Sequence, residues 1–199
     1  MSSGEEKAWN ILRDLKPETV CKNAMVSFDD STGLYLLKSF GMDLSVAPEN
    51  KSIYSEAPYA DLLLSRLGYF SKLSIPFYLT SAMDIPLTGR LVRPGNVKGG
   101  DIFFRGTHIL PLDKLALKYG HDKEEFLKRG ADLGGMQMSY GDASVKLFPF
   151  PRLPVVIILW QEDDEFPSRA DILFDSTCEF HLALDILWST AMECLLIMI

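Results

Sequence analysis

Residues 151–175 read PRLPVVIILWQEDDEFPSRADILFD, and they hold the most apolar run of the chain beside a cluster of four acidic residues. The apolar run starts at Val155 and ends at Trp160, is rich in β-branched residues, and is too short for an ordinary helix. Such a run predicts a strand that is covered on both faces and lies in the middle of a sheet.

The acidic residues 162–165 follow this strand directly and must leave the core for water. Phe166 and Pro167 then turn the chain, and residues 170–174 have the β-compatible side chains to return as a second strand. The stretch as a whole predicts an antiparallel hairpin with an acidic tip.

Composition supports a globular protein of one domain. The chain has 199 residues, of which 47% are hydrophobic and 24% charged, close to the average for soluble domains. A chain of this length can bury a full core without disulfides or a structural metal. We therefore expect a single α+β domain with a mainly antiparallel sheet packed by several helices.

Charge and cysteine content exclude several classes of partner. The net charge is −7 and no dense basic run occurs, which disfavours binding to nucleic acid. The three cysteines form no C-x-x-C pair, so the chain cannot by itself build a zinc finger or a cysteine-ligated iron–sulfur cluster.

Neither terminal stretch predicts export or insertion into a membrane. The first residues, MSSGEEKAWNIL, are acidic where a signal peptide is basic. The apolar residues 182–199 contain Asp185 and Glu193, which disfavours a helix that spans a membrane. We expect a cytoplasmic protein with no membrane partner.

The N-terminal half predicts a helix, a set of short strands and a second helix. Residues 5–15 have the spacing of an amphipathic helix, which Pro17 ends. Residues 24–55 alternate with period two between turn residues and predict an antiparallel meander. Apolar residues then recur at helical spacing from Pro58 to Leu73, which predicts the second helix.

The middle of the chain is rich in proline and glycine. Residues 76–100 contain three prolines and four glycines and predict a long ordered excursion over the surface, with one strand at 91–93. A short strand is expected at 101–104. Loops of this length often carry function.

The third quarter predicts two consecutive helices and a hairpin. The first helix begins near Pro111 and ends at Gly120, and the second is capped by Asp122. Alternating residues between 136 and 148 then predict a hairpin that leads into the central strand. Residues 148–151 (FPFP) are too rich in proline for a central strand and are interpreted as a crossover.

The last helix is expected to run from Leu184 to Ile199 and is apolar on nearly every side. With the helix predicted after Pro58, it should pack on the sheet. A single core has difficulty covering every side of such a helix, so we also expect a partner there, with a homodimer as one form.

Two groups of residues have the chemistry for a functional site, and each has a structural alternative. The carboxylates of residues 162–165 could bind Mg²⁺ or Ca²⁺, but they lack the spacing of an EF-hand, and a solvated hairpin tip is the more common role of such a cluster. His108 lies in a glycine-containing loop before a helix, where metal ligands and catalytic groups are often placed, but a histidine there more often holds the loop or caps the helix.

Common catalytic and nucleotide-binding patterns are missing from the sequence. It contains no H-E-x-x-H, G-x-S-x-G, P-loop or G-x-G-x-x-G pattern. The aromatic residues near the central strand are more often core than cofactor box.

The sequence resembles the DUF3786 family of bacterial and archaeal proteins. The resemblance is carried by GGDIFFRGTHILP (99–111), LGG (133–135), YGDASVK and, above all, the string W-x-x-D-x-E-F-P-x-x-A-x-x-L-F-D in residues 160–175. It covers nearly the whole chain. Some relatives look like fusions to iron–sulfur or corrinoid-associated modules of anaerobes, which implies a protein partner of that kind.

Two hypotheses from different classes follow. The first is a non-enzymatic module that binds a ligand or partner in corrinoid or iron–sulfur redox metabolism, with a pocket between residues 76–100, the His108 loop and the acidic hairpin. No motif encodes a cofactor, so its identity stays open, with a corrinoid or a haem as the candidates that binding experiments should test. The second is a metal-dependent enzyme that uses the carboxylates of residues 162–165 with His108 as base.

The residues predicted to bind the ligand are His108, Trp160, Glu165 and Asp175. In this hypothesis His108 faces the pocket edge and coordinates a metal-centred cofactor or hydrogen-bonds a polar ligand. Trp160 supplies a flat apolar wall, and Glu165 or Asp175 orients the imidazole. No residue is assigned to a protein-bound metal ion.

Overall fold

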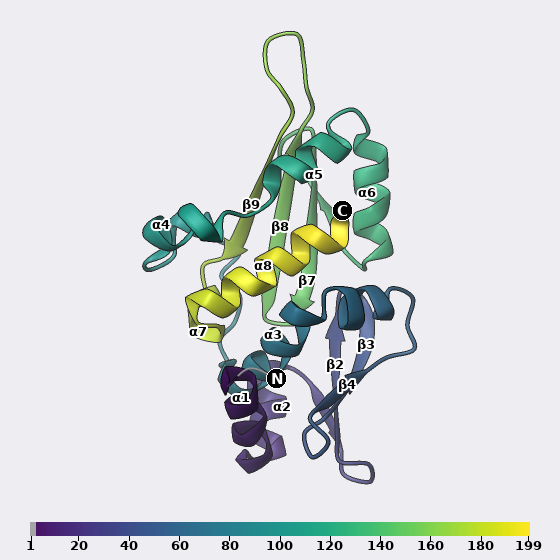
Figure 1. Cartoon of the computed structure of the whole chain (residues 1–199), viewed down its shortest axis with the longest axis vertical. Helices are drawn as coiled ribbons and strands as arrows, with labels where there is room; N and C mark the ends of the chain where they lie inside the picture. Colours follow the sequence, from purple (N-terminus) through teal and green to yellow (C-terminus); the bar gives the residue numbers. More distant parts are fainter. Residues whose placement is uncertain (1–2) are drawn as a thin grey trace.

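The computed structural model describes residues 3–199 and shows an α+β domain with two antiparallel sheets (Figure 1). The first sheet has the order β1 (Ser27–Asp29), β2 (Leu34–Ser39), β3 (Met42–Ala47), β4 (Ser52–Tyr54). The second has the order β5 (Leu91–Val92), β9 (Arg169–Asp175), β8 (Leu153–Trp160), β7 (Ala143–Phe150), β6 (Met136–Met138). The helices are α1 (Ser3–Asp14), α2 (Pro17–Ala24), the π-helix η1 (Leu62–Arg66), α3 (Gly68–Ser81), α4 (Gly100–Phe103), α5 (Leu112–Tyr119), α6 (Lys123–Asp132), α7 (Cys178–His181) and α8 (Leu184–Met198), with 3₁₀ turns at Pro94–Asn96 and Gly106–His108.

Strand β8 is the middle strand of the five-stranded sheet, as its apolar sequence predicts. It pairs antiparallel with β7 on one side and with β9 on the other. All of its residues except Trp160 are buried. The predicted hairpin is also confirmed, because Trp160 lies directly opposite Arg169 and the acidic residues 162–165 are exposed in the loop between them.

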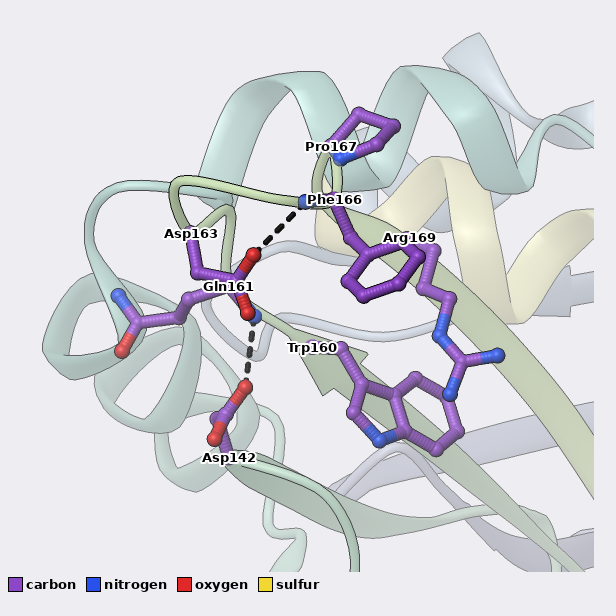
Figure 2. A pocket seen from close by; sticks show the side chains of 7 residues that line it. All are labelled: Asp142, Trp160, Gln161, Asp163, Phe166, Pro167 and Arg169. Atoms are coloured by element: carbon purple, nitrogen blue, oxygen red, sulfur yellow. Dashed lines mark hydrogen bonds between the residues drawn. The ribbon is translucent and has the colours of Figure 1, made fainter.

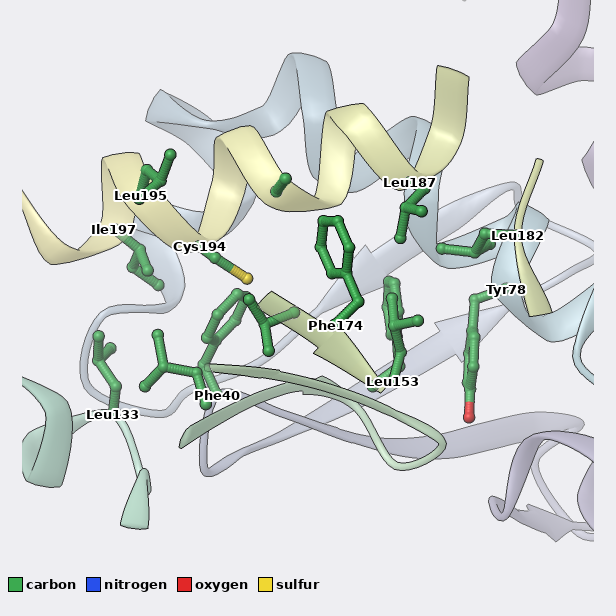
Figure 3. Packing of buried hydrophobic residues seen from close by; sticks show 14 of the residues in the cluster. Phe40, Tyr78, Leu133, Leu153, Phe174, Leu182, Leu187, Cys194, Leu195 and Ile197 are labelled. Carbon is green, nitrogen blue, oxygen red and sulfur yellow. The ribbon is translucent and has the colours of Figure 1, made fainter. Parts of the chain in front are cut away.

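Helix α8 lies across one face of this sheet, with α5 and α6 on the same side (Figure 1). Figure 3 shows Phe174 of β9 and Leu153 of β8 facing Leu187 and Cys194 of the helix. Helix α3 packs on another side of α8, so most residues of α8 are buried within the chain. The predicted burial of the last helix is therefore confirmed.

The predicted meander is the four-stranded sheet, and the predicted caps of α6 are also present. Each strand of the meander pairs with the next one along the chain. The two sheets meet where Phe40 N–H donates to Phe148 O, at 2.8 Å. The carboxylate of Asp122 accepts a hydrogen bond of 2.9 Å from Glu125 N–H at the start of α6.

Two helix boundaries differ from the sequence-based expectation because both involve proline. Pro17 begins the separate helix α2, since a proline at the first helical position loses no hydrogen bond. The helix predicted from Pro58 to Leu73 is present as the π-helix η1 (Leu62–Arg66) followed by α3, which starts at Gly68 and continues through Pro76 to Ser81. Burial of the apolar residues around Pro76 offsets a cost of about 3 kcal/mol for an interior proline.

The strand expected at residues 101–104 is wrong, because α4 occupies this segment. Gly99 has a left-handed φ of 77°, and a Cβ on Gly100 would stand 2.0 Å from Pro94 O. Only glycine fits at position 100, because any side chain would collide with this carbonyl. The segment forms a short helix that projects from the body of the domain (Figure 1).

The crossover expected at residues 148–151 is wrong as well. Strand β7 extends to Phe150, and its register with β8 shifts between Leu147 and Phe150. The pairs between β7 and β6 end at Lys146, so the missing N–H of Pro149 removes no ladder hydrogen bond on that side.

The five-stranded sheet has two differently used faces. Val155, Ile157 and Leu159 point into the core beneath α8 and belong to its apolar cluster. Since side chains alternate along a strand, Val156, Ile158 and Trp160 point to the opposite face. Cavities lie at both ends of this second face, one beside Trp160 and one beside Val156.

Candidate functional site

A cavity of about 650 Å³ lies where β8 and β9 join the acidic loop. We call it the hairpin cleft, and it is lined by Asp142, Trp160, Gln161, Asp163, Phe166, Pro167 and Arg169. Its volume lies within the roughly 300–1,000 Å³ that is usual for small-molecule sites. Of the residues predicted from sequence to bind a ligand, Trp160 lines this cleft.

Trp160 and Arg169 form the wall of the hairpin cleft. They are direct cross-strand partners, so their side chains leave the sheet on the same face. The Arg169 guanidinium carbon lies 4.1 Å from the centre of the Trp160 ring, a cation–π contact. Within residues 3–199 the Trp160 ring is the only described partner of this guanidinium, so its hydrogen-bond donors line the cleft without an anionic partner.

Phe166 faces the same space from the loop, as Figure 2 shows. Its side chain is 66% exposed, which is high for a phenylalanine. The cleft is therefore bounded by one half-buried indole, one exposed phenyl ring and one guanidinium.

Asp142 and Asp163 hold the two turns that form the rim of the cleft. Asp142 Oδ2 accepts a hydrogen bond of 2.8 Å from Gln161 N–H. Asp163 Oδ1 accepts from Phe166 N–H at 2.7 Å (Figure 2). It also accepts from Glu165 N–H at 2.9 Å. These bonds fix the loop in a defined shape and leave the carboxylates beside the cavity.

Gly141 brings the neighbouring turn against the central strand. Its φ is 58°, and a Cβ at this position would stand 2.7 Å from both Ile158 Cγ2 and Leu159 O. Any larger residue would push the turn, and Asp142 with it, away from Trp160.

The other acidic residues of the loop are not gathered into a metal site. Glu162 Oε2 lies 3.6 Å from His121 Nε2, so the histidine beside the acidic tip is His121 and not His108. Glu165 is exposed, and its side chain does not line the cleft. Within residues 3–199, no group of three or more His, Cys, Asp or Glu side chains is arranged to hold a metal ion.

Asp175 lies at the opposite end of β9 from Arg169, about 20 Å away for six residues of strand. It is buried, and its carboxylate accepts hydrogen bonds from Thr88, Gly89 and Thr177, both from backbone N–H groups and from the threonine hydroxyls. Burial acts to raise the pKa of Asp175, but these hydrogen bonds outweigh it and hold the pKa below its ordinary value. The carboxylate thus fastens the loop at Thr88 to the end of the sheet.

His108 lies in a third place, beside α8. Its ring stacks on Phe103 at 4.1 Å and meets the edge of Trp188 at 5.1 Å. The only hydrogen-bond contact of its ring within the described residues is the 3.4 Å approach of Nδ1 to Thr107 Oγ1. These contacts hold the projecting α4 segment against α8.

The structure thus distributes the four predicted site residues instead of bringing them together. Trp160 lines the hairpin cleft, Glu165 lies in the loop next to it, Asp175 lines the cavity at the other end of the sheet, and His108 joins an aromatic cluster. Whether any of them binds a ligand stays a prediction.

Arg169 and Asp142 are two residues of the cleft that sequence reasoning did not assign to a site. The place of Arg169 follows from the predicted hairpin, because the strands on either side of the acidic loop pair residue by residue and Arg169 lies opposite Trp160. The place of Asp142 does not, since it comes from a different hairpin that packs beside the first.

No helix of residues 3–199 has both the length and the apolar character needed to cross a membrane. Comparison with curated proteins and with solved structures gave no match. The family model described as "Domain of unknown function (DUF3786)" matches residues 16–196, which include every strand of both sheets. This chain therefore belongs to the DUF3786 family.

Proposed function

We propose that this domain is a binding module for a flat, conjugated small molecule that carries an acidic group, and that the ligand occupies the hairpin cleft. The observation that carries the proposal is the Trp160–Arg169 pair, which offers a flat surface and unpaired hydrogen-bond donors at one place. Phe166 supports it, because an exposed ring above that surface can close over a bound ligand.

Each part of the proposed ligand follows from the chemistry of the cleft. A conjugated ring stacks favourably on an indole and on a guanidinium plane. An acidic substituent gives Arg169 the bidentate partner that its fork of donors suits. Asp142 and Asp163 at the rim accept hydrogen bonds from amide or amine groups on the same ligand.

Tetrapyrroles are the first ligand class to test. Haem is a flat, conjugated ring with peripheral carboxylates that suit the guanidinium, and corrinoids are related macrocycles whose peripheral amides suit the carboxylates of the cleft. The resemblance to relatives fused with corrinoid-associated modules supports the same class and a role beside an iron–sulfur or corrinoid protein.

The experiment is a titration of anaerobically purified protein with haem and with cobalamin, followed by absorbance. We expect saturable binding that Trp160→Ala and Arg169→Gln each weaken by about tenfold or more. The matched controls are Tyr69→Ala and Arg66→Gln, which change an exposed aromatic and an exposed arginine far along the chain from the cleft and should leave binding unchanged.

Absence of binding for both compounds, or equal loss in the control variants, contradicts the proposal. Metal content of the purified protein is measured in the same sample. A stoichiometric metal ion that is lost from a variant of the acidic residues 162–165 would favour the metal-dependent enzyme instead.

A further inference from the structure

A second cavity, of about 390 Å³, lies on the same face of the five-stranded sheet as the hairpin cleft but at its other end. We call it the loop cavity. One wall is the loop between α3 and β5, with Leu87 and Thr88, and the floor is Pro154 and Val156 of β8. Trp160 lies four residues farther along β8, so the two cavities are separate sites on one surface.

The loop wall is fixed before any ligand arrives. The buried carboxylate of Asp175 accepts from Gly89 N–H at 2.7 Å and from Thr88 Oγ1 at 3.0 Å, and it also accepts from Thr177. Thr88 Oγ1 makes a further hydrogen bond of 2.8 Å with Ser176 Oγ. A preformed wall lowers the entropy cost of binding, because the loop does not have to be ordered by the ligand.

The carboxylate oxygens of Asp175 are already engaged by these donors, whereas the ammonium of Lys146 has no hydrogen-bond or ionic partner among the described residues. Lys146 lies on β7 directly beside Val156, is half-buried, and lines the loop cavity. Within residues 3–199 its ammonium group has no ion pair, and its closest described charge contact is the Phe148 ring at 5.8 Å. The stem of Lys146 is partly buried against the cavity while its ammonium has no anionic partner among the described residues, so the cavity has room and charge for an anion.

The remaining walls are mainly apolar. Leu87, Leu91, Met138 and Val156 surround the space next to Lys146. Leu87 is 43% exposed, so its side chain is available to cover a ligand and gains burial when one binds.

We propose that the loop cavity binds a monocarboxylic acid with a short apolar tail. The carboxylate pairs with the ammonium of Lys146, and the tail lies between Leu87, Leu91 and Met138. This site is independent of the ligand proposed for the hairpin cleft, since no residue lines both cavities.

The test uses octanoate as the probe and isothermal calorimetry as the readout. The full chain should bind octanoate at a single saturable site. Octanol and octylamine lack the anionic group, so their affinity should be lower by about tenfold or more. Lys146→Gln should weaken octanoate binding by about tenfold, while Lys38→Gln, which changes a strand lysine of the other sheet, should not.

The proposal would be overturned by no saturable binding of octanoate, by equal binding of octanol, or by unchanged binding in Lys146→Gln. Loss of octanoate binding in Trp160→Ala would also overturn it, since the probe would then occupy the hairpin cleft. If Lys146→Gln does not fold, Leu87→Glu decides the matter, because it places a repelling carboxylate on an exposed side chain. Retained binding in that variant counts against the site, and lost binding supports it.

Discussion

Glu193 is the residue whose surroundings conflict most with its chemistry. It lies in the middle of α8 and is 2% exposed. Oε2 accepts a hydrogen bond of 2.9 Å from Ser74 Oγ of α3, and Oε1 is buried without a partner in the described residues. Burial raises the pKa of Glu193 to about 8, so the side chain is mainly protonated at neutral pH.

This raised pKa makes the stability of the domain depend on pH in a definite direction. The folded pKa is about 8 and the ordinary value is 4.5. The unfolded chain therefore releases the proton first, and the stability contributed by Glu193 is fully present below pH 4.5 and is lost as pH rises to about 8. Above that pH the loss is complete.

We expect Glu193→Gln to remove this dependence, because glutamine has the shape of the protonated acid but no proton to lose. The gain in unfolding free energy over the wild type should be small at pH 4 and on the order of 4 kcal/mol at pH 9. Urea unfolding at a series of pH values measures it. Asp185→Asn changes an exposed acid on the same helix and serves as the control. A gain that is the same at every pH would contradict the assignment.

At the scale of elements, β8 is the strand on which both the core and the candidate sites depend. Its core-facing residues are covered by α8, and its other face carries Val156 and Trp160 toward the two cavities. Any slip of its register by one residue would exchange these two sets of side chains. The hydrogen-bonded neighbours on both sides prevent such a slip.

Truncation of β8 in its core should therefore be costly. Ile157 is fully buried in the cluster beneath α8. We expect Ile157→Ala to lower the free energy of unfolding by about 2–5 kcal/mol, from the lost apolar burial and the cavity that remains. Ile102→Ala, at a site that is 78% exposed on α4, should change it by less than about 0.5 kcal/mol. An unchanged melting temperature of Ile157→Ala would contradict this account of the core.

At the scale of the whole molecule, Arg152 joins parts of the chain that are far apart in sequence. It lies in the turn between β7 and β8 and is 8% exposed. Its guanidinium donates to Lys22 O and Asn23 O at the end of α2, to Ile85 O, and to the carboxylate of Asp84. This side chain thus links the end of α2 to the turn between β7 and β8.

We expect Arg152→Met to destabilise the domain by about 3–5 kcal/mol, because three carbonyl groups and one carboxylate lose their donor in a partly buried place. Thermal unfolding measures the loss, and Arg13→Met, at an exposed site on α1, is the control. Hydrogen exchange should show the protection of α2 falling more than that of α8. Equal changes in both helices would show that Arg152 does not link the two parts as described.

Self-association through α8 stays a prediction. Its physical basis was that one core cannot cover every side of an apolar helix, and the structure shows α3, α5, α6 and β7 packed around α8 within the chain. Sedimentation at high concentration tests the homodimer directly.

The sequence by itself determined the local features of this protein. Period-two alternation and turn residues indicate the meander and the β8–β9 hairpin, and the Asp122 cap marks the start of α6. These features depend on residues close together in the chain, so pattern and propensity are enough to find them.

The tertiary structure decided the features in which burial or a distant partner outweighs local preference. Pro76 stays inside α3 because its neighbours are buried, and Pro149 stays in β7 because no β6 residue pairs there. The same holds for function: the sequence selected Trp160 and Asp175 from one motif, but strand geometry places them at opposite ends of a sheet face. Separation along an extended strand grows by about 3.3 Å per residue, so residues of one motif can belong to two different sites.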